Sequence, residues 1–311
     1  MIQYLLKKGL ILIVSLWCVI TGTFFLMHIL PGDPFIGERT LPQEVLNSLY
    51  AYYGLDKPLW VQYVNYLKGV ISFDLGPSII YQGRSVNQFI QEGFPVSALL
   101  GLQALALAIS FGVLLGTWAA LKRSQWQDAG AMALSTLGVS VPNFVLASLL
   151  QFIFCVKLHW LPVARWGTFA HTILPSIALA ALPTAFIARL TRSNMVEVLQ
   201  QDYIKTATAK GLPLLLIAMK HGLRNALLPV ISYLGPVATQ ILTGSFMIEK
   251  IFAIPGLGQW MIHSISGRDY PMIMGLTIFF SSFLMISMFF VDILYSLIDP
   301  RIRSAKDSTY V

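Results

Sequence analysis

Six long apolar segments constrain the fold of this chain more than any other feature of its sequence. A transmembrane helix needs about 20 mostly apolar residues. The segments cover residues 9–30, 95–121, 129–156, 173–188, 227–248 and 272–298, and the short fourth one contains Pro175 and Pro183. Of the 311 residues 56% are hydrophobic and 11% are charged, whereas about 25% are charged in ordinary soluble domains. We therefore predict an all-α polytopic membrane protein with six transmembrane helices.

The first segment could instead be a signal peptide, since Lys7 and Lys8 precede it. A retained span is favoured, because residues 9–30 are longer than a typical signal-peptide core and no Ala-x-Ala-like site follows. Six spans put both termini on one side. With the termini inside, 13 Lys and Arg residues lie in inside segments and four in the short outside loops. The positive-inside rule therefore predicts cytoplasmic termini.

Two loops are unusual. The outside loop, residues 31–94, is long and net acidic, and Pro58 can start a helix there. One face of that helix would carry Leu59, Tyr63, Tyr66, Leu67 and Val70. It is either an interfacial helix lying on the bilayer or part of a lid or docking surface above a pore.

The other unusual loop, residues 189–226, is basic and cytoplasmic in this topology. It reads as two helices joined at Gly211-Leu212-Pro213, because glycine ends helices and proline opens them. The first helix covers Asp202–Gly211. Apolar residues at helical spacing predict that this loop packs against something: Val198, Leu199, Tyr203 and Ala207.

Within the spans, small residues recur every four positions in the second segment: Ala104, Ala108, Gly112, Gly116 and Ala120. This spacing predicts a seam where two helix backbones approach closely. Asp292 is an intramembrane carboxylate and hence a functional-site candidate. The favoured alternative is a structural role, in which Asp292 pairs with a cation such as Arg189 or reaches interfacial water.

Several functions are excluded by missing motifs. The dipeptide Gly-Lys never occurs, so the chain has no phosphate-binding loop of the Gly-x-x-x-x-Gly-Lys type and should not hydrolyse nucleotide itself. Cys18 and Cys155 fall in apolar segments without metal-ligand spacing, so neither a metal nor a cofactor is expected. The net charge of +7 is spread over loops without a basic, aromatic cluster, which argues against nucleic-acid binding.

Short motifs in a fixed order give the chain a family likeness. In chain order they are Leu30-Pro31-Gly32-Asp33-Pro34, Asp202–Gly211, Arg224-Asn225-Ala226-Leu227-Leu228-Pro229, Ile248-Glu249-Lys250-Ile251-Phe252, Ile254-Pro255-Gly256-Leu257-Gly258, Arg268-Asp269-Tyr270, Asp292 and Asp299-Pro300-Arg301. Together they resemble the B-type integral-membrane permease subunit of bacterial ABC importers of the oligopeptide, dipeptide and nickel group. The resemblance covers essentially the whole length and is closest to the oligopeptide branch.

The chain departs from the family's motif of Glu-Ala-Ala, three residues and Gly in the cytoplasmic loop. Lys205 and Thr206 stand at the Glu and first Ala positions, and only Ala207 and Gly211 hold. The departure speaks against sugar-type permeases, because the peptide branch looks similar in having Lys or Arg, Thr and Ala there. It also leaves no acidic side chain for a salt bridge at the Glu position.

The resemblance implies a type I ABC importer permease fold, a single domain over residues 1–311 in the bacterial inner membrane. The cytoplasmic loop would form a coupling helix that docks on an ATPase subunit through contact or shape-setting residues: Asp202, Tyr203, Thr206, Ala207, Ala209 and Gly211. A turn at Pro255, Gly256 and Gly258 would lie near the pore mouth or the binding-protein surface, or be a plain tight turn.

The implied function is to form half of an oligopeptide pathway, without being an enzyme. The implied partners are a second, homologous permease, one or two ATPase subunits, a binding protein for peptides and membrane lipid. Alternatives are a dipeptide, nickel or other small-solute permease of the same family, an ion-driven secondary transporter, or a receptor-like scaffold that signals through the cytoplasmic loop.

Overall fold

The computed structural model describes residues 2–29, 35 and 42–298. Its contacts group the chain into two compact units. Unit 1 comprises Met1–Pro95 and Gly256–Ile286, and unit 2 comprises Val96–Pro255 and Ser287–Val311. The single domain over residues 1–311 that is expected from the sequence remains a prediction.

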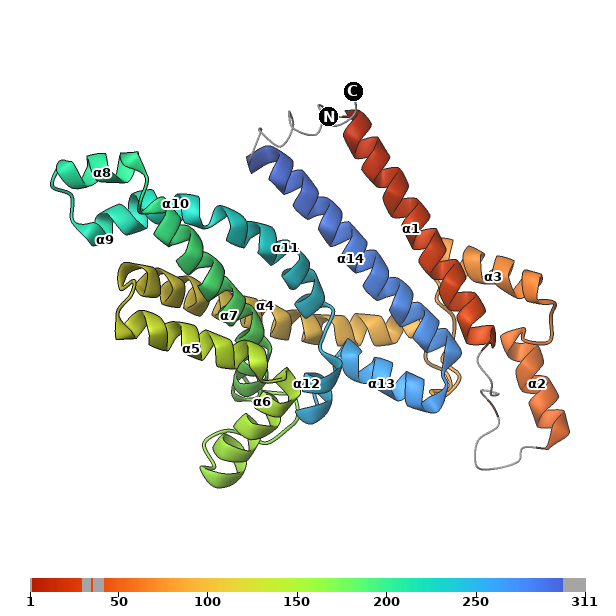
Figure 1. Cartoon of the computed structure of the whole chain (residues 1–311). Coiled ribbons are helices and arrows are strands. Elements are labelled where there is room, and N and C mark those ends of the chain that lie inside the picture. Colours follow the sequence, from red (N-terminus) through yellow and green to blue (C-terminus); the bar gives the residue numbers. More distant parts are fainter. Residues whose placement is uncertain (1, 30–34, 36–41, 299–311) are drawn as a thin grey trace. The chain divides into compact units, whose positions relative to one another are not determined.

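Unit 1 is mainly helical in its described part (Figure 1), and residues 72–85 form turns and an isolated bridge between Pro77 and Ser85. It contains α1 (Ile2–Ile29), α2 (Gln43–Tyr53), α3 (Leu59–Ile71), α13 (Leu257–Gly267) and the first parts of α4 (Val86–Leu121) and α14 (Tyr270–Ile298). Its core joins α4, α13 and α14 through buried Val86, Phe89, Leu257, Met272 and Leu276. Trp260 covers this core with its ring 4.7 Å from that of Phe89.

The predicted helix after Pro58 is α3, and its aromatic face packs on α1. The hydroxyl groups of Tyr63 and Thr21 lie 2.7 Å apart, and the Tyr66 ring stacks on Phe24 at 5.6 Å. Trp60, at the edge of this face, is exposed. The amphipathic face is thus explained by packing within unit 1, and both earlier interpretations of this helix stay predictions.

A buried carboxylate, Asp269, holds the segment before α4 against the start of α14. It accepts hydrogen bonds from the Ser78 hydroxyl, from the backbone N–H groups of Ile79 and Ile80 at 3.2 and 3.4 Å, and from Met272 N–H at 3.3 Å. Tyr53 adds a hydrogen bond to the Ser78 carbonyl at 3.0 Å. Burial, followed by the charges of Tyr52 and Asp269, raises the pKa of Tyr53, so it remains a neutral donor.

Unit 2 holds the second part of α4 and most of the remaining helices. These are α5 (Trp126–Ser140), α6 (Asn143–Leu150), α7 (Ala170–Val198), α8 (Asp202–Ala209), α9 (Leu214–Leu216), α10 (Leu223–Ala226), α11 (Leu228–Leu242) and α12 (Phe246–Ile251). Two π-helical turns, η1 (Gln151–Lys157) and η2 (Ile217–Gly222), continue α6 and α9. The second part of α14 also belongs to this unit.

The described residues contain five helices long and apolar enough to span a membrane, or six if one bent pair counts as a span. The pair is α5 with α6–η1, bent by 102°, so the segment predicted as a span over residues 129–156 is interrupted at residues 141–142, and whether it forms one span stays a prediction. Pro142 explains the bend. It lacks a backbone N–H and disfavours helical geometry in the residue before it, and Val141 is extended at φ −88° and ψ 120°.

The fourth span is longer than expected, because α7 runs ten residues beyond residue 188 to Val198. Side chains of α5 form hydrogen bonds with the two arginines of this extension, Arg189 and Arg192. Arg192 donates from Nε and Nη2 to the two carboxylate oxygens of buried Asp128 at 2.6 and 2.7 Å. Arg189 donates to the Thr136 hydroxyl at 2.8 Å. The cytoplasmic loop predicted to begin at residue 189 therefore starts inside a helix.

The small-residue seam of α4 is confirmed as a packing feature, and α7 is the helix it contacts. A Cβ atom added to Gly112 would lie 2.7 Å from Ile187 Cβ, and one added to Gly116 would lie 2.4 Å from the Ala188 carbonyl oxygen. Ala104, Ala108 and Ala120 on the same seam are buried. The backbones approach so closely that only glycine fits at its centre.

Between α11 and α12 the helix is interrupted at Thr243–Ser245. Gly244 has φ +99°, and an added Cβ would lie 2.6 Å from Oε1 of Glu249. Glu249 is fully buried and accepts a hydrogen bond from the Ser97 hydroxyl at 2.8 Å. The Glu249 carboxylate thus fills the space beside the break, which requires glycine at position 244.

Candidate coupling site

The predicted helix Asp202–Gly211 is present as α8, which begins at Asp202 and ends at Ala209. Asp202 in its first turn complements the helix dipole, and Lys205 pairs with it at 2.8 Å. The Thr206 hydroxyl donates to the Asp202 carbonyl at 3.0 Å, so both ends of the first turn are tied together. In Figure 1, α8 lies with α9 and α10 at one end of α7.

The end of α8 has the geometry expected from its glycine. Gly211 has φ +78°, its N–H donates to the Thr208 carbonyl at 2.9 Å, and Leu212 N–H donates to the Ala207 carbonyl at 3.4 Å. These two bonds form the Schellman motif, which needs a left-handed residue at the glycine position. Pro213 then opens the next helical segment. Gly211 is therefore a residue that sets the shape of this loop.

One face of α8 is anchored to the chain itself. Ile204 and Ala207 are buried against Ile217 of η2, with Leu199 and Leu212 packed around them. The expectation that this loop packs on something is confirmed, and the surface it packs on is its own second half. Ala207 sets the depth of this packing, since it points into the chain and is only 8% exposed.

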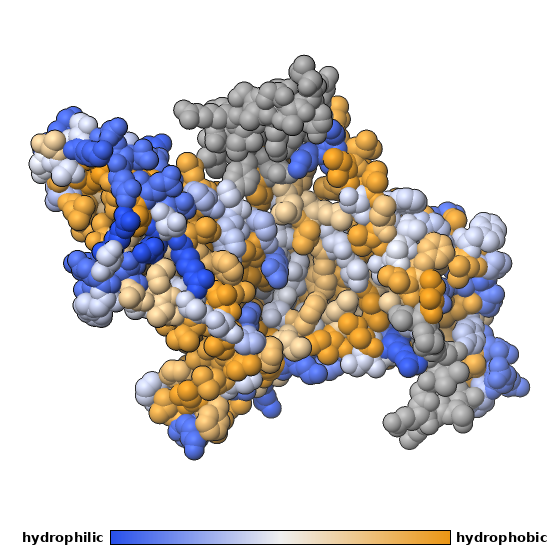
Figure 2. Space-filling model, in the orientation of Figure 1, coloured by the Kyte–Doolittle hydropathy of each residue, from blue (hydrophilic) through white to orange (hydrophobic). Residues whose placement is uncertain are grey.

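The other face of α8 is open. Five of the six residues proposed for coupling are exposed: Asp202, Tyr203, Thr206, Ala209 and Gly211. Tyr203 is 42% exposed and is held by a hydrogen bond of 2.8 Å from the Asn225 amide to its hydroxyl oxygen. Figure 2 shows hydrophilic residues gathered at the end of unit 2 that carries α8. The open face is thus largely polar and exposed, and Tyr203 on it is held in position by Asn225.

The support beneath α8 reaches the long helices. Behind Ile217, Ala218 and Ala226 pack with Met195 of α7 and with Ala120 at the end of α4. Asp128 ties α5 to this region. Besides its ion pair with Arg192 of α7, it accepts a hydrogen bond at 3.0 Å from the N–H of Ser124, which lies between α4 and α5. A force on α8 would therefore be carried into α4, α5 and α7 through close-packed side chains.

The other predicted site residues lie outside the coupling loop. Pro255 is exposed, but Gly256 and Gly258 are buried, and Gly256 is the N-cap of α13. This turn starts a helix, and a role at a pore mouth remains a prediction. Asp292 lies in α14, but its side chain and the motif at residues 30–34 fall outside what the structure describes, so their roles also stay predictions.

Sequence reasoning missed four supporting residues. Ile204 could have been found from its spacing with Ala207 on one helix face. Asn225 and the Asp128–Arg192 pair act over long separations in sequence, and no local signal reveals them. Among the described residues, no cluster of His, Cys, Asp and Glu could hold a metal ion.

Comparison with known proteins shows the class of protein that this fold and loop define. Residues 112–304 match the family of binding-protein-dependent transport system inner membrane components, and residues 1–95 match the N-terminal model of such membrane components. The chain belongs to this family, and its place is the inner membrane. The resemblance to B-type importer permeases is confirmed.

Its relatives are permease proteins of peptide transport systems. The chain is 51% identical to the dipeptide transport system permease protein DppB of Bacillus subtilis, over 98% of this chain and 99% of that protein. It is 45% identical to the oligopeptide transport system permease protein OppB of Escherichia coli strain K12, over 97% and 100%. It is 42% identical to DppB of Lactococcus lactis, over 97% and 100%.

Proposed function

We propose that this protein is a permease subunit of an ATP-driven importer and forms half of a pathway for oligopeptides across the inner membrane. The observation that carries the proposal is α8, a short helix with an open polar face on a close-packed support. A small rigid element of this kind can transmit the closure of a partner to the spans. The sequence has no phosphate-binding loop, so the ATPase is a separate subunit.

The proposed partners agree with this arrangement and with the family to which the chain belongs. The exposed face of α8 docks on the ATPase on the cytoplasmic side, which is also where the charge distribution places the termini. A second, homologous permease forms the other half of the pathway, and a peptide-binding protein delivers the substrate from outside. Relatives named for oligopeptides and for dipeptides both match the chain over nearly its full length, which supports peptides as the substrate class.

The test is uptake by the transporter assembled with its partner subunits in proteoliposomes. Labelled tri-alanine should enter only when ATP is supplied to the ATPase side and the binding protein is present. Di-alanine and Ni²⁺, offered with the same binding protein, should enter more slowly. Uptake driven by an ion gradient without nucleotide would overturn the proposal in favour of a secondary transporter.

A further inference from the structure

Unit 2 contains a cavity whose chemistry differs from that of the surrounding apolar helices. Its volume is about 360 Å³, within the range of small-ligand sites. It lies among α6, α7, α11, the break after α11 and α12. The lining residues are Asn143, Leu179, Leu182, Pro183, Tyr233, Val237, Gln240, Ile241, Thr243, Gly244, Ser245, Phe246 and Met247.

The lining offers hydrogen-bonding groups but no charge. The side-chain amides of Asn143 and Gln240 and the Tyr233 hydroxyl make no hydrogen bond to another described residue. Pro183 lacks an N–H, which leaves the carbonyl of Leu179 without its ordinary helical donor. Donors and acceptors therefore occur together, and no lining residue is charged at neutral pH, because the lining has no Asp, Glu, Lys, Arg or His and the Tyr233 phenol is neutral there.

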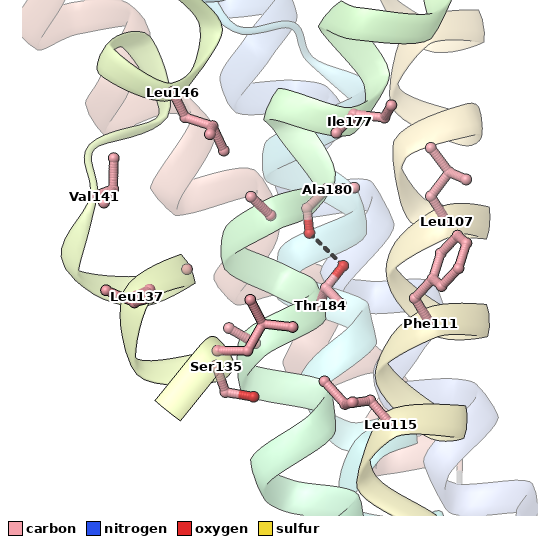
Figure 3. A pocket seen from close by; sticks show the side chains of 14 residues that line it. Leu107, Phe111, Leu115, Ser135, Leu137, Val141, Leu146, Ile177, Ala180 and Thr184 are labelled. Carbon is pink, nitrogen blue, oxygen red and sulfur yellow. Dashed lines mark hydrogen bonds between the residues drawn. The ribbon is translucent and has the colours of Figure 1, made fainter. Parts of the chain in front are cut away.

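A second cavity shows that this pattern is not general in unit 2. Figure 3 shows that cavity, of about 480 Å³, among α4, α5, α6 and α7, where Leu107, Phe111 and Leu146 point toward it. Its Thr184 hydroxyl is bound to the Ala180 carbonyl at 2.6 Å and its Ser135 hydroxyl to the Ala131 carbonyl at 2.9 Å. With its polar groups satisfied, it suits hydrocarbon and not a polar ligand.

We infer that the cavity of Asn143, Tyr233 and Gln240 is a contact site for the main chain of a peptide during passage, an inference that rests on the proposed function. A peptide main chain presents one donor and one acceptor per residue and no charge. An uncharged lining with unpaired amides matches that chemistry whatever side chains the peptide carries. Tyr233, Val237 and Gln240 recur at helical spacing along one face of α11, so they form a continuous wall, and Gly244 lines the cavity just beyond the end of that helix.

Charge placed in the cavity tests this inference. Gln240 is exposed and can change without disturbing the core. In Gln240→Lys, uptake of tri-lysine relative to tri-glutamate should fall about tenfold from the wild-type ratio, equivalent to about 1.4 kcal/mol. In Gln240→Glu the ratio should rise by a similar factor. The matched controls Gln125→Lys and Gln125→Glu put the same charges on an exposed position outside the cavity and should leave the ratio unchanged.

The outcomes separate this inference from the proposed function. If the wild-type transporter imports no peptide with ATP, the proposed function fails. If the wild type imports both peptides and the two Gln240 variants change their uptake equally, the cavity does not contact the peptide and the inference is overturned. Equal changes, together with loss of the second permease on purification, would identify the cavity as an interface between subunits.

Discussion

The anchor of α8 gives the sharpest test of the coupling site. Ile204 is 4% exposed and packs in a cluster with only two other buried residues, Ala207 and Ile217. Ile204→Ala removes most of the apolar contact that docks α8. Substitutions of this kind cost about 2–5 kcal/mol, and a small cluster near the surface falls at the lower end. A loss of about 2–3 kcal/mol lowers the ratio of docked to undocked α8 roughly 30- to 150-fold.

This cluster is separate from the main core of unit 2, so the loss should be local. Amide hydrogen exchange within α8 should accelerate, while exchange in α4 and α7 stays as in the wild type. In the assembled transporter, ATP turnover should no longer rise with peptide-loaded binding protein, and uptake should fall in proportion. Ile204→Val is the matched control, because it costs about 1 kcal/mol and keeps the packing.

Two results would refute this reasoning. If α8 amides in Ile204→Ala exchange as slowly as in the wild type, the cluster does not anchor the helix. If their protection is lost but ATP turnover remains coupled to peptide uptake, a docked α8 is not needed for coupling.

Three further perturbations test the packing and the conformation of the chain. Gly116→Ala should destabilise the α4–α7 seam by about 1–3 kcal/mol and so lower the melting temperature of the protein in detergent. The control Gly130→Ala in α5 should be neutral or stabilising, because a Cβ atom added there meets no atom within 4 Å. Asp269→Ala should cost about 2–4 kcal/mol by leaving buried donors unpaired, and the exposed Asp56→Ala should change the melting temperature little. Gly211→Val should reduce peptide-stimulated ATP turnover because its φ is +78°, and Gly211→Asn should retain most of it; equal loss in both would show that left-handed geometry is not the requirement.

The sequence predicted those features that depend on local pattern. Six apolar segments, the limits of α8, its glycine stop and the α4 seam all follow from spacing and from the backbone preferences of Gly and Pro. The bend at Pro142 was overlooked because hydropathy averages over a window and ignores where a proline sits within it. The proline was visible, and its effect on Val141 could have been anticipated.

The length of α7 could not be read from the sequence. Arg189 and Arg192 look like the end of a span, since charge is costly in a membrane. Their partners, Thr136 and Asp128, lie more than 50 residues earlier and are brought near only by the fold. The burial of Ala207 could not be predicted either. Its neighbour Ile217 belongs to a π-helical turn, and no local pattern in the sequence indicates that turn.

The contact between α4 and α7 restricts how unit 2 can move. Ile187 and the Ala188 carbonyl already fill the space where Gly112 and Gly116 lack a Cβ atom, so a shift of either helix along the other would drive these groups against neighbouring side chains. These two helices must therefore move together as one rigid body. Bending within unit 2 is easier where the helical hydrogen bonds are already interrupted, as at Pro142 and at Thr243–Ser245.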